Sequence, residues 1–193
     1  MPTTTTERRR RRHADRQRAI LRAAAEEFAT AGYERATLER IGDRVGLSKG
    51  SLYYYVDGKE HLLVLLLEAV VDELLEAVDP TAPPAERLRQ LVRAHVAATL
   101  GPEGRVLVEN LDAIPDSEAT AAVRARYAAT LRDLLTDGIA DGTFHEVPIR
   151  ATVRFLLGGL NAACRRFRPT TEEDTERLVD SLTRLVLDGI VRR

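Results

Sequence analysis

Apolar side chains recur every three or four positions along most of the chain, which is the periodicity of amphipathic helices. Glycine and proline separate the periodic segments, as at Gly101-Pro102 and Pro115. The predicted helices cover about residues 14–31, 37–45, 49–55, 59–78, 85–100, 105–114, 117–140, 148–166 and 172–191. No segment shows the alternation of a strand, so the sequence predicts an all-α protein of about nine helices.

Residues 37–55 combine two short predicted helices with a tight turn between them. Thr37 suits the N-cap of the first helix, and Ser48 suits the N-cap of the second. Gly46 follows the first helix, where a left-handed C-cap favours glycine. This order predicts a helix-turn-helix, a unit whose second helix enters the major groove of DNA.

The second helix of this unit carries a lysine, small residues and three consecutive tyrosines. Early side chains of such a helix reach base edges, and tyrosine hydroxyls reach phosphates. A run of five arginines upstream suits an arm that contacts phosphates or a minor groove, although a solvated helix start would also explain it. A lysine at the start of the next helix adds charge where backbone N–H groups attract phosphate. The predicted DNA-binding residues are Arg8, Arg9, Arg10, Arg11, Arg12, Thr37, Ser48, Lys49, Gly50, Ser51, Tyr53, Tyr54, Tyr55 and Lys59.

At these positions the chain resembles the TetR/AcrR family of bacterial transcriptional repressors. The matching residues are Gly46-Leu47-Ser48, Leu52-Tyr53-Tyr54-Tyr55-Val56 and Lys59-Glu60-His61-Leu62. Val56 stands where many members have phenylalanine. The resemblance is specific over about the first third of the chain. It implies a homodimer that binds a palindromic double-stranded DNA operator and responds to a small-molecule effector.

The charge is unevenly distributed along the chain. Residues 1–61 hold 13 Lys and Arg against 9 Asp and Glu, whereas the remainder holds 16 against 21. A basic head on an acidic body fits a DNA-binding segment followed by a regulatory one. We therefore expect a DNA-binding domain at residues 1–60 and an effector-binding and dimerisation domain at residues 61–193.

Several polar residues interrupt the apolar stripes of the predicted body helices. Buried polar groups of this kind line ligand pockets, although they also satisfy one another inside ordinary cores. The candidate effector-binding residues are His95, Thr99, Asn110, Tyr127 and Asn161. The segment Gly158-Gly159-Leu160-Asn161 is similar to the corresponding region of family members that sense acyl-CoA thioesters. Arg165, Arg166 and Arg168 suit the C-terminal end of a helix dipole or an anionic ligand.

The last two predicted helices carry more apolar surface than one neighbour needs. In the family that the chain resembles, these helices pair across a two-fold axis into a four-helix bundle. The resulting candidate interface residues are Phe155, Leu156, Leu160, Leu178, Leu182, Leu185 and Val186.

Catalytic and metal-binding patterns are sparse in the sequence. The four histidines lack metal-ligand spacing, and no glycine-rich phosphate loop is present, so we predict no metal, cofactor or catalytic residue and no enzyme. The single cysteine, Cys164, suits a reducing cytoplasm and a core position. No apolar run is long enough to span a bilayer.

The predicted function is a cytoplasmic, ligand-responsive repressor. The alternatives are a DNA-binding regulator without an effector and a helical enzyme that uses the body pocket.

Overall fold

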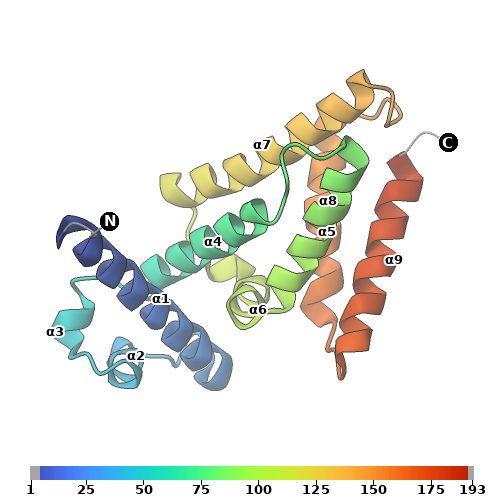
Figure 1. Cartoon of the computed structure of the whole chain (residues 1–193). Coiled ribbons are helices and arrows are strands. Elements are labelled where there is room, and N and C mark those ends of the chain that lie inside the picture. The colour runs from blue at the N-terminus through green and yellow to red at the C-terminus, as the bar shows by residue number, and fades with distance from the viewer. Residues whose placement is uncertain (1–4, 191–193) are drawn as a thin grey trace.

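The computed structural model describes residues 5–190, and within them it contains nine α-helices, one 3-10 turn and no strand. Figure 1 shows α1 to α3 grouped at one end of the molecule and α5, α7, α8 and α9 at the other, with α4 running between the two groups. The prediction of an all-α protein of nine helices is confirmed. The helices are α1 (Thr5–Ala31), α2 (Leu38–Arg44), α3 (Lys49–Leu52), α4 (Lys59–Glu76), α5 (Pro84–Leu100), α6 (Pro102–Glu109), α7 (Glu118–Ala140), α8 (Ile149–Arg166) and α9 (Glu172–Ile190), with the 3-10 turn at Leu111–Ala113.

Two helix boundaries differ from the prediction in ways that affect the DNA-binding end. Helix α1 begins at Thr5 instead of near residue 14, because arginine is a good helix former and the arginine run extends the helix. Helix α3 ends at Leu52, and the following residues turn sharply: the N–H groups of Tyr55 and Val56 both donate to the Leu52 carbonyl. The arginine run is therefore helical, and the three tyrosines lie at and beyond the end of α3.

The head has its own apolar core, formed by α1 to α3 and the first half of α4. Its fully buried side chains include Ile20, Ile41, Leu52 and Leu62. Helix α6 also belongs to this core, through Val106 and Leu107 among others, and packs directly against α1. The sequence analysis assigned this helix to the body. Periodicity shows that a helix has an apolar face, but it does not show which other helix packs against that face.

The body core lies between α4, α5, α7, α8 and α9. Its fully buried side chains include Leu88, Leu91, Leu131 and Leu135. Helix α4 contributes Leu62, Leu63 and Leu66 to the head core and Val71 and Leu74 to the body core. The two segments predicted at residues 1–60 and 61–193 are thus joined by one continuous helix; their outermost residues, 1–4 and 191–193, lie outside the described range.

Two glycines allow backbone segments to pack closely, one in the helix-turn-helix and one between α5 and α6. A Cβ atom on Gly42 would lie 2.6 Å from the Leu47 carbonyl oxygen, so glycine lets the turn fold back onto α2. A Cβ atom on Gly104 would overlap the Ala98 carbonyl, so glycine lets the start of α6 pack against the end of α5. Both contacts are with backbone atoms, which cannot move aside as a side chain would.

Among residues 5–190, no helix is both long enough and apolar enough to cross a membrane.

Candidate DNA-binding surface and effector cavity

Local capping holds the helix-turn-helix as the sequence predicted. The Thr37 hydroxyl accepts a hydrogen bond from the Arg40 N–H at 3.3 Å, and the Ser48 hydroxyl accepts one from the Ser51 N–H at 3.2 Å. Gly46 adopts a left-handed φ of 66°, which favours glycine at the end of α2. These contacts fix the start of α3 relative to α2.

Helix α3 and the turn after it are exposed to solvent. Lys49, Gly50, Ser51 and Tyr53 are exposed, and Tyr54 keeps 72% of its surface accessible. The Lys49 ammonium pairs with the Glu39 carboxylate of α2 at 2.9 Å, and both side chains are more than half exposed. An exposed ion pair of this kind is weak, so the lysine can exchange its partner for DNA.

The arginine run lies beside the tyrosines that follow α3. The His13 ring stacks on the Tyr55 ring with centroids 5.2 Å apart, and Tyr54 packs edge-on against Tyr55. A shallow groove at this contact is lined by Arg9 and Arg12. His13 and Arg16 line the same groove, because residues spaced by three or four share one face of a helix. Arg8, Arg10 and Arg11 are exposed and do not line it.

Lys59 has a structural position that the sequence did not indicate. Its ammonium donates to the carbonyls of Tyr33 and Glu34, at 2.8 and 3.0 Å, and lies 4.8 Å from the centre of the Tyr33 ring. The ammonium group is therefore hydrogen-bonded to the turn after α1. These contacts link the start of α4 to the turn after α1. The contact of Lys59 with a DNA phosphate stays a prediction.

A buried carboxylate anchors α2 to α1, and sequence reasoning missed it. Glu27 is 1% exposed, and its carboxylate accepts hydrogen bonds from Arg44 Nε and Nη2 at 3.2 and 3.0 Å. Arg40 Nη1 lies 3.2 Å from the other carboxylate oxygen. The sequence does contain a pattern that indicates this ion pair: α1 has a glutamate on its apolar face, and α2 has two arginines one turn apart.

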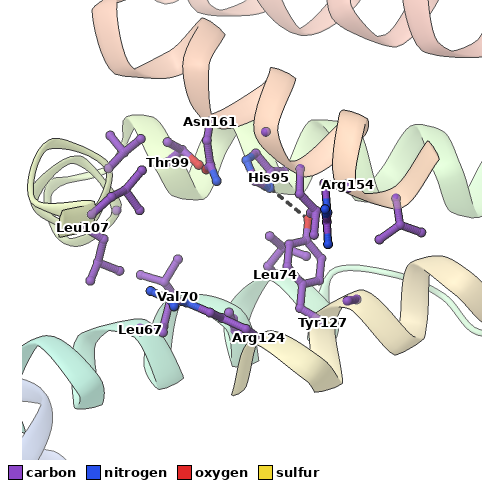
Figure 2. A pocket seen from close by; sticks show the side chains of 18 of the residues that line it. Leu67, Val70, Leu74, His95, Thr99, Leu107, Arg124, Tyr127, Arg154 and Asn161 are labelled. Carbon is purple, nitrogen blue, oxygen red and sulfur yellow. Dashed lines mark hydrogen bonds between the residues drawn. The ribbon is translucent and has the colours of Figure 1, made fainter. Parts of the chain in front are cut away.

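The body contains a cavity of about 790 Å³ between α4, α5, α6, α7 and α8. This volume lies within the range of small-molecule sites, which combine apolar walls with a few polar groups. Figure 2 shows Leu67 and Val70 of α4 and Leu107 of α6 on one side, and His95 with Tyr127 toward the other. The cavity reaches the surface at exposed arginines of α7 and α8.

His95 supplies the cavity with a buried polar group that has spare hydrogen-bonding capacity. Its Nδ1 atom lies 2.9 Å from the Tyr127 hydroxyl, whereas its Nε2 atom is buried without a hydrogen-bond partner in the described structure. Burial lowers the pKa of His95 to about 4, an effect that the neighbouring Asn161 side chain partly offsets. The ring is therefore neutral at pH 7, and burial likewise raises the pKa of Tyr127, which stays protonated.

Four of the five residues predicted to bind effector line this cavity: His95, Thr99, Tyr127 and Asn161. Asn110 does not line it. The Asn110 side chain donates to the Val106 carbonyl at 2.8 Å and so caps its own helix, α6. The sequence could not separate this local hydrogen bond from a pocket contact, because both occur at polar breaks in an apolar stripe.

The residues predicted for the dimer interface divide into two groups. Leu156, Leu160 and Val186 are buried inside the protomer. Phe155 on α8 and Leu185 on α9 remain 75% and 70% exposed, and Leu178 and Leu182 are partly exposed. Helical spacing identified the apolar positions, but it did not show which of these side chains are buried in the core of the protomer itself.

The fold and these two surfaces define a class: an all-helical protein with a helix-turn-helix head and a body that contains a cavity. Family models match both parts, as "Bacterial regulatory proteins, tetR family" over residues 20–66 and "Tetracyclin repressor-like, C-terminal domain" over residues 81–190. The chain therefore belongs to the TetR family and is a ligand-responsive, DNA-binding transcriptional regulator of the repressor type.

Individual relatives agree with this assignment. The fatty acid metabolism regulator protein of Bacillus subtilis (strain 168) is 22% identical over 181 residues, which cover 89% of this chain and 93% of that protein. The crystal structure of the TetR family regulator PfmR from Thermus thermophilus matches with a TM-score of 0.74 and 29% identity, covering 90% of this chain and 99% of that one. The structure of AibR in complex with isovaleryl coenzyme A and operator DNA matches the fold with a TM-score of 0.72 and 23% identity, covering 88% of this chain and 97% of that one.

Proposed function

We propose that this protein is a dimeric repressor released from its operator by an amphipathic acyl thioester, such as an acyl-CoA, bound in the body cavity. The observation that carries this proposal is the cavity itself, which is mostly apolar and contains one unsatisfied buried nitrogen. The fatty acid metabolism regulator and AibR, which resemble this chain along most of its length, support the choice of ligand class.

In this proposal α3 enters the major groove, with Lys49, Gly50 and Ser51 facing base edges and Tyr53 and Tyr54 facing phosphates. The N-terminal half of α1 contacts the adjacent backbone through its arginines. A dimer brings two such heads to two half-sites. Phe155 and Leu185 are the exposed apolar side chains that a second copy would cover.

Lys49→Ala is expected to relax sequence preference at one operator position in each half-site. A lysine that donates to guanine O6 and N7 contributes about 1–3 kcal/mol of discrimination. Binding to a set of operators with single base changes measures this preference. The control is Glu39→Ala, which removes the partner of Lys49 and leaves the lysine in place. An equal loss of affinity for every sequence after Lys49→Ala would identify Lys49 as a phosphate contact.

The polar end of the cavity suits a thioester carbonyl. A neutral imidazole that accepts at Nδ1 from the Tyr127 hydroxyl carries its proton on Nε2, which then faces the cavity as a donor. A carbonyl oxygen would accept a hydrogen bond from this donor, next to the Asn161 side chain. The acyl chain would then lie along the apolar wall formed by Leu67, Val70 and Leu107.

That apolar wall connects the cavity to the head. Leu107 lines the cavity and is also part of the head core, as is Ile114, and Leu67 and Val70 pack against that core. A ligand that displaces these side chains acts on α4 and α6, both of which pack against α1. Lys59 then links the start of α4 to the turn after α1. An effector that favours one arrangement of these helices shifts the population of heads able to bind the operator.

Asn161→Leu is expected to abolish most of the effector response while leaving operator binding intact. Asn161 lines the cavity, and its helix α8 lies at the opposite end of the molecule from α3 (Figure 1). Operator binding is measured with and without butanoyl-, octanoyl- and dodecanoyl-CoA. Asn110→Leu is the matched control, since Asn110 lies outside the cavity. A full response of Asn161→Leu, or no release of the wild type by any chain length, would contradict the proposal.

A further inference from the structure

Four arginines surround the surface end of the cavity. Arg124 and Arg132 lie on α7, and Arg150 and Arg154 lie on α8; all four line the cavity and are exposed. Figure 2 shows Arg124 and Arg154 coming from the helices on opposite sides of the cavity. We refer to these four residues as the arginine quartet.

No member of the arginine quartet has a hydrogen bond or ion pair from its guanidinium to another residue among those that the structure describes. Other body arginines are paired: Arg87 with Asp137, Arg126 with Asp72 and Arg168 with Glu109. Arg105 donates to the Cys164 carbonyl. Within residues 61–190, Arg165 and Arg166 are the remaining arginines without such a partner, and they lie outside the cavity. Unpaired guanidinium groups are thus concentrated where the cavity meets solvent.

Sequence spacing explains how the quartet is assembled. Arg150 and Arg154 are four residues apart on α8, and Arg124 and Arg132 are eight apart on α7, so each pair lies on one face of its helix. Helices α7 and α8 pack against each other and bring the two faces to the same opening. Like charges four residues apart on a helix, such as Arg150 and Arg154, repel each other, and a bound anion would remove this repulsion.

The chemistry of guanidinium groups identifies the kind of anion. Arginine forms paired, charge-assisted hydrogen bonds with phosphate, and several arginines together suit more than one phosphate group. Besides the quartet, the cavity offers His95 Nε2 and an apolar wall. Figure 2 shows Arg154 near His95 and Arg124 near Leu67 and Val70. An amphiphile with an anionic head, a polar linkage and an apolar chain would find a matching group for each part.

We propose that the arginine quartet is a binding site for the phosphate groups of the effector, so that the cavity selects acyl thioesters with a phosphorylated carrier over the same acyl group on an uncharged carrier. This inference rests on the proposed thioester effector and names the part of the molecule that the surface end of the cavity recognises. Arg165, Arg166 and Arg168, which the sequence had suggested for an anionic ligand, do not line the cavity.

Calorimetric titration with octanoyl-CoA and octanoyl-pantetheine tests the proposal, because the second ligand keeps the thioester and lacks every phosphate. The wild type is expected to bind octanoyl-CoA at least about tenfold more tightly in 0.1 M salt, and this preference should shrink as salt rises. Arg150→Ala/Arg154→Ala is expected to lose at least about tenfold in octanoyl-CoA affinity and little in octanoyl-pantetheine affinity. Arg150→Lys/Arg154→Lys keeps the charge and should restore part of the preference.

Arg165→Ala/Arg166→Ala is the matched control, since it removes two exposed, unpaired arginines of the same helix outside the cavity. This variant should retain the wild-type preference. Equal affinities of the wild type for the two ligands would overturn the quartet proposal alone, as would an equal loss in the control variant. Failure of the wild type to bind either ligand would overturn the thioester proposal, and the quartet proposal with it.

Discussion

Arg9→Ala/Arg12→Ala is expected to reduce the salt dependence of operator binding by about 3 to 4 units of log–log slope. Each arginine that neutralises a DNA phosphate contributes about 0.9 to this slope, and a dimer would lose four such contacts. The corresponding loss of affinity at physiological salt is on the order of 10²–10³-fold. The reason is geometric: these two side chains line the groove beside Tyr54 and Tyr55, next to the end of α3. Operator titrations at several salt concentrations measure the slope directly.

The control for this experiment is Arg8→Ala/Arg11→Ala. It removes the same charge at the same spacing from two arginines that do not line the groove. We expect its slope to change by less than half as much. Equal slopes for the two double variants would show that the arginine run acts as a diffuse charge, and an unchanged slope in both would show that it does not contact DNA.

Glu27→Ala is expected to lower the free energy of unfolding by about 3 kcal/mol. Removing one partner of a buried ion pair leaves the other charges uncompensated, at a cost of about 3–5 kcal/mol. The lower value applies because Arg40 and Arg44 keep 61% and 38% of their side chains exposed and can be partly solvated. For a chain of this length, that loss corresponds to a fall in Tm of about 6–12 °C. Operator affinity should also fall, because α2 loses its anchor to α1.

The adjacent Glu26→Ala provides the comparison. The Glu26 side chain is 62% exposed, and its carboxylate pairs with the Nη1 atom of Arg44 at 3.3 Å. An exposed pair of this kind contributes less than about 1 kcal/mol. Thermal unfolding of the two variants side by side therefore measures the effect of burial on otherwise similar pairs. Similar Tm values would show that the carboxylate of Glu27 does not anchor the head.

The sequence alone determined the helices and the identity of the head. Helical periodicity comes from local geometry, and the caps at Thr37 and Ser48 and the left-handed Gly46 depend on residues only a few positions apart. Because these features depend only on residues that are close together in the sequence, they can be predicted from the sequence. Four of the five residues predicted to bind effector, each a polar break in an apolar stripe, line the cavity, and their contact with an effector stays a prediction.

Tertiary structure decided which side chains meet. Helix α6 packs on α1, Lys59 is bound by carbonyls from a turn about 25 residues earlier, and Glu27 holds two arginines of another helix. The arginine quartet exists only because α7 and α8 pack at one opening. Periodicity shows that a helix has an inward face, but the partner of that face depends on how the helices pack, and packing depends on side chains far apart in the chain. For this protein, the sequence therefore determined the local elements and their chemistry, and the packing of α4, α6, α7 and α8 determined how the cavity is connected to the head.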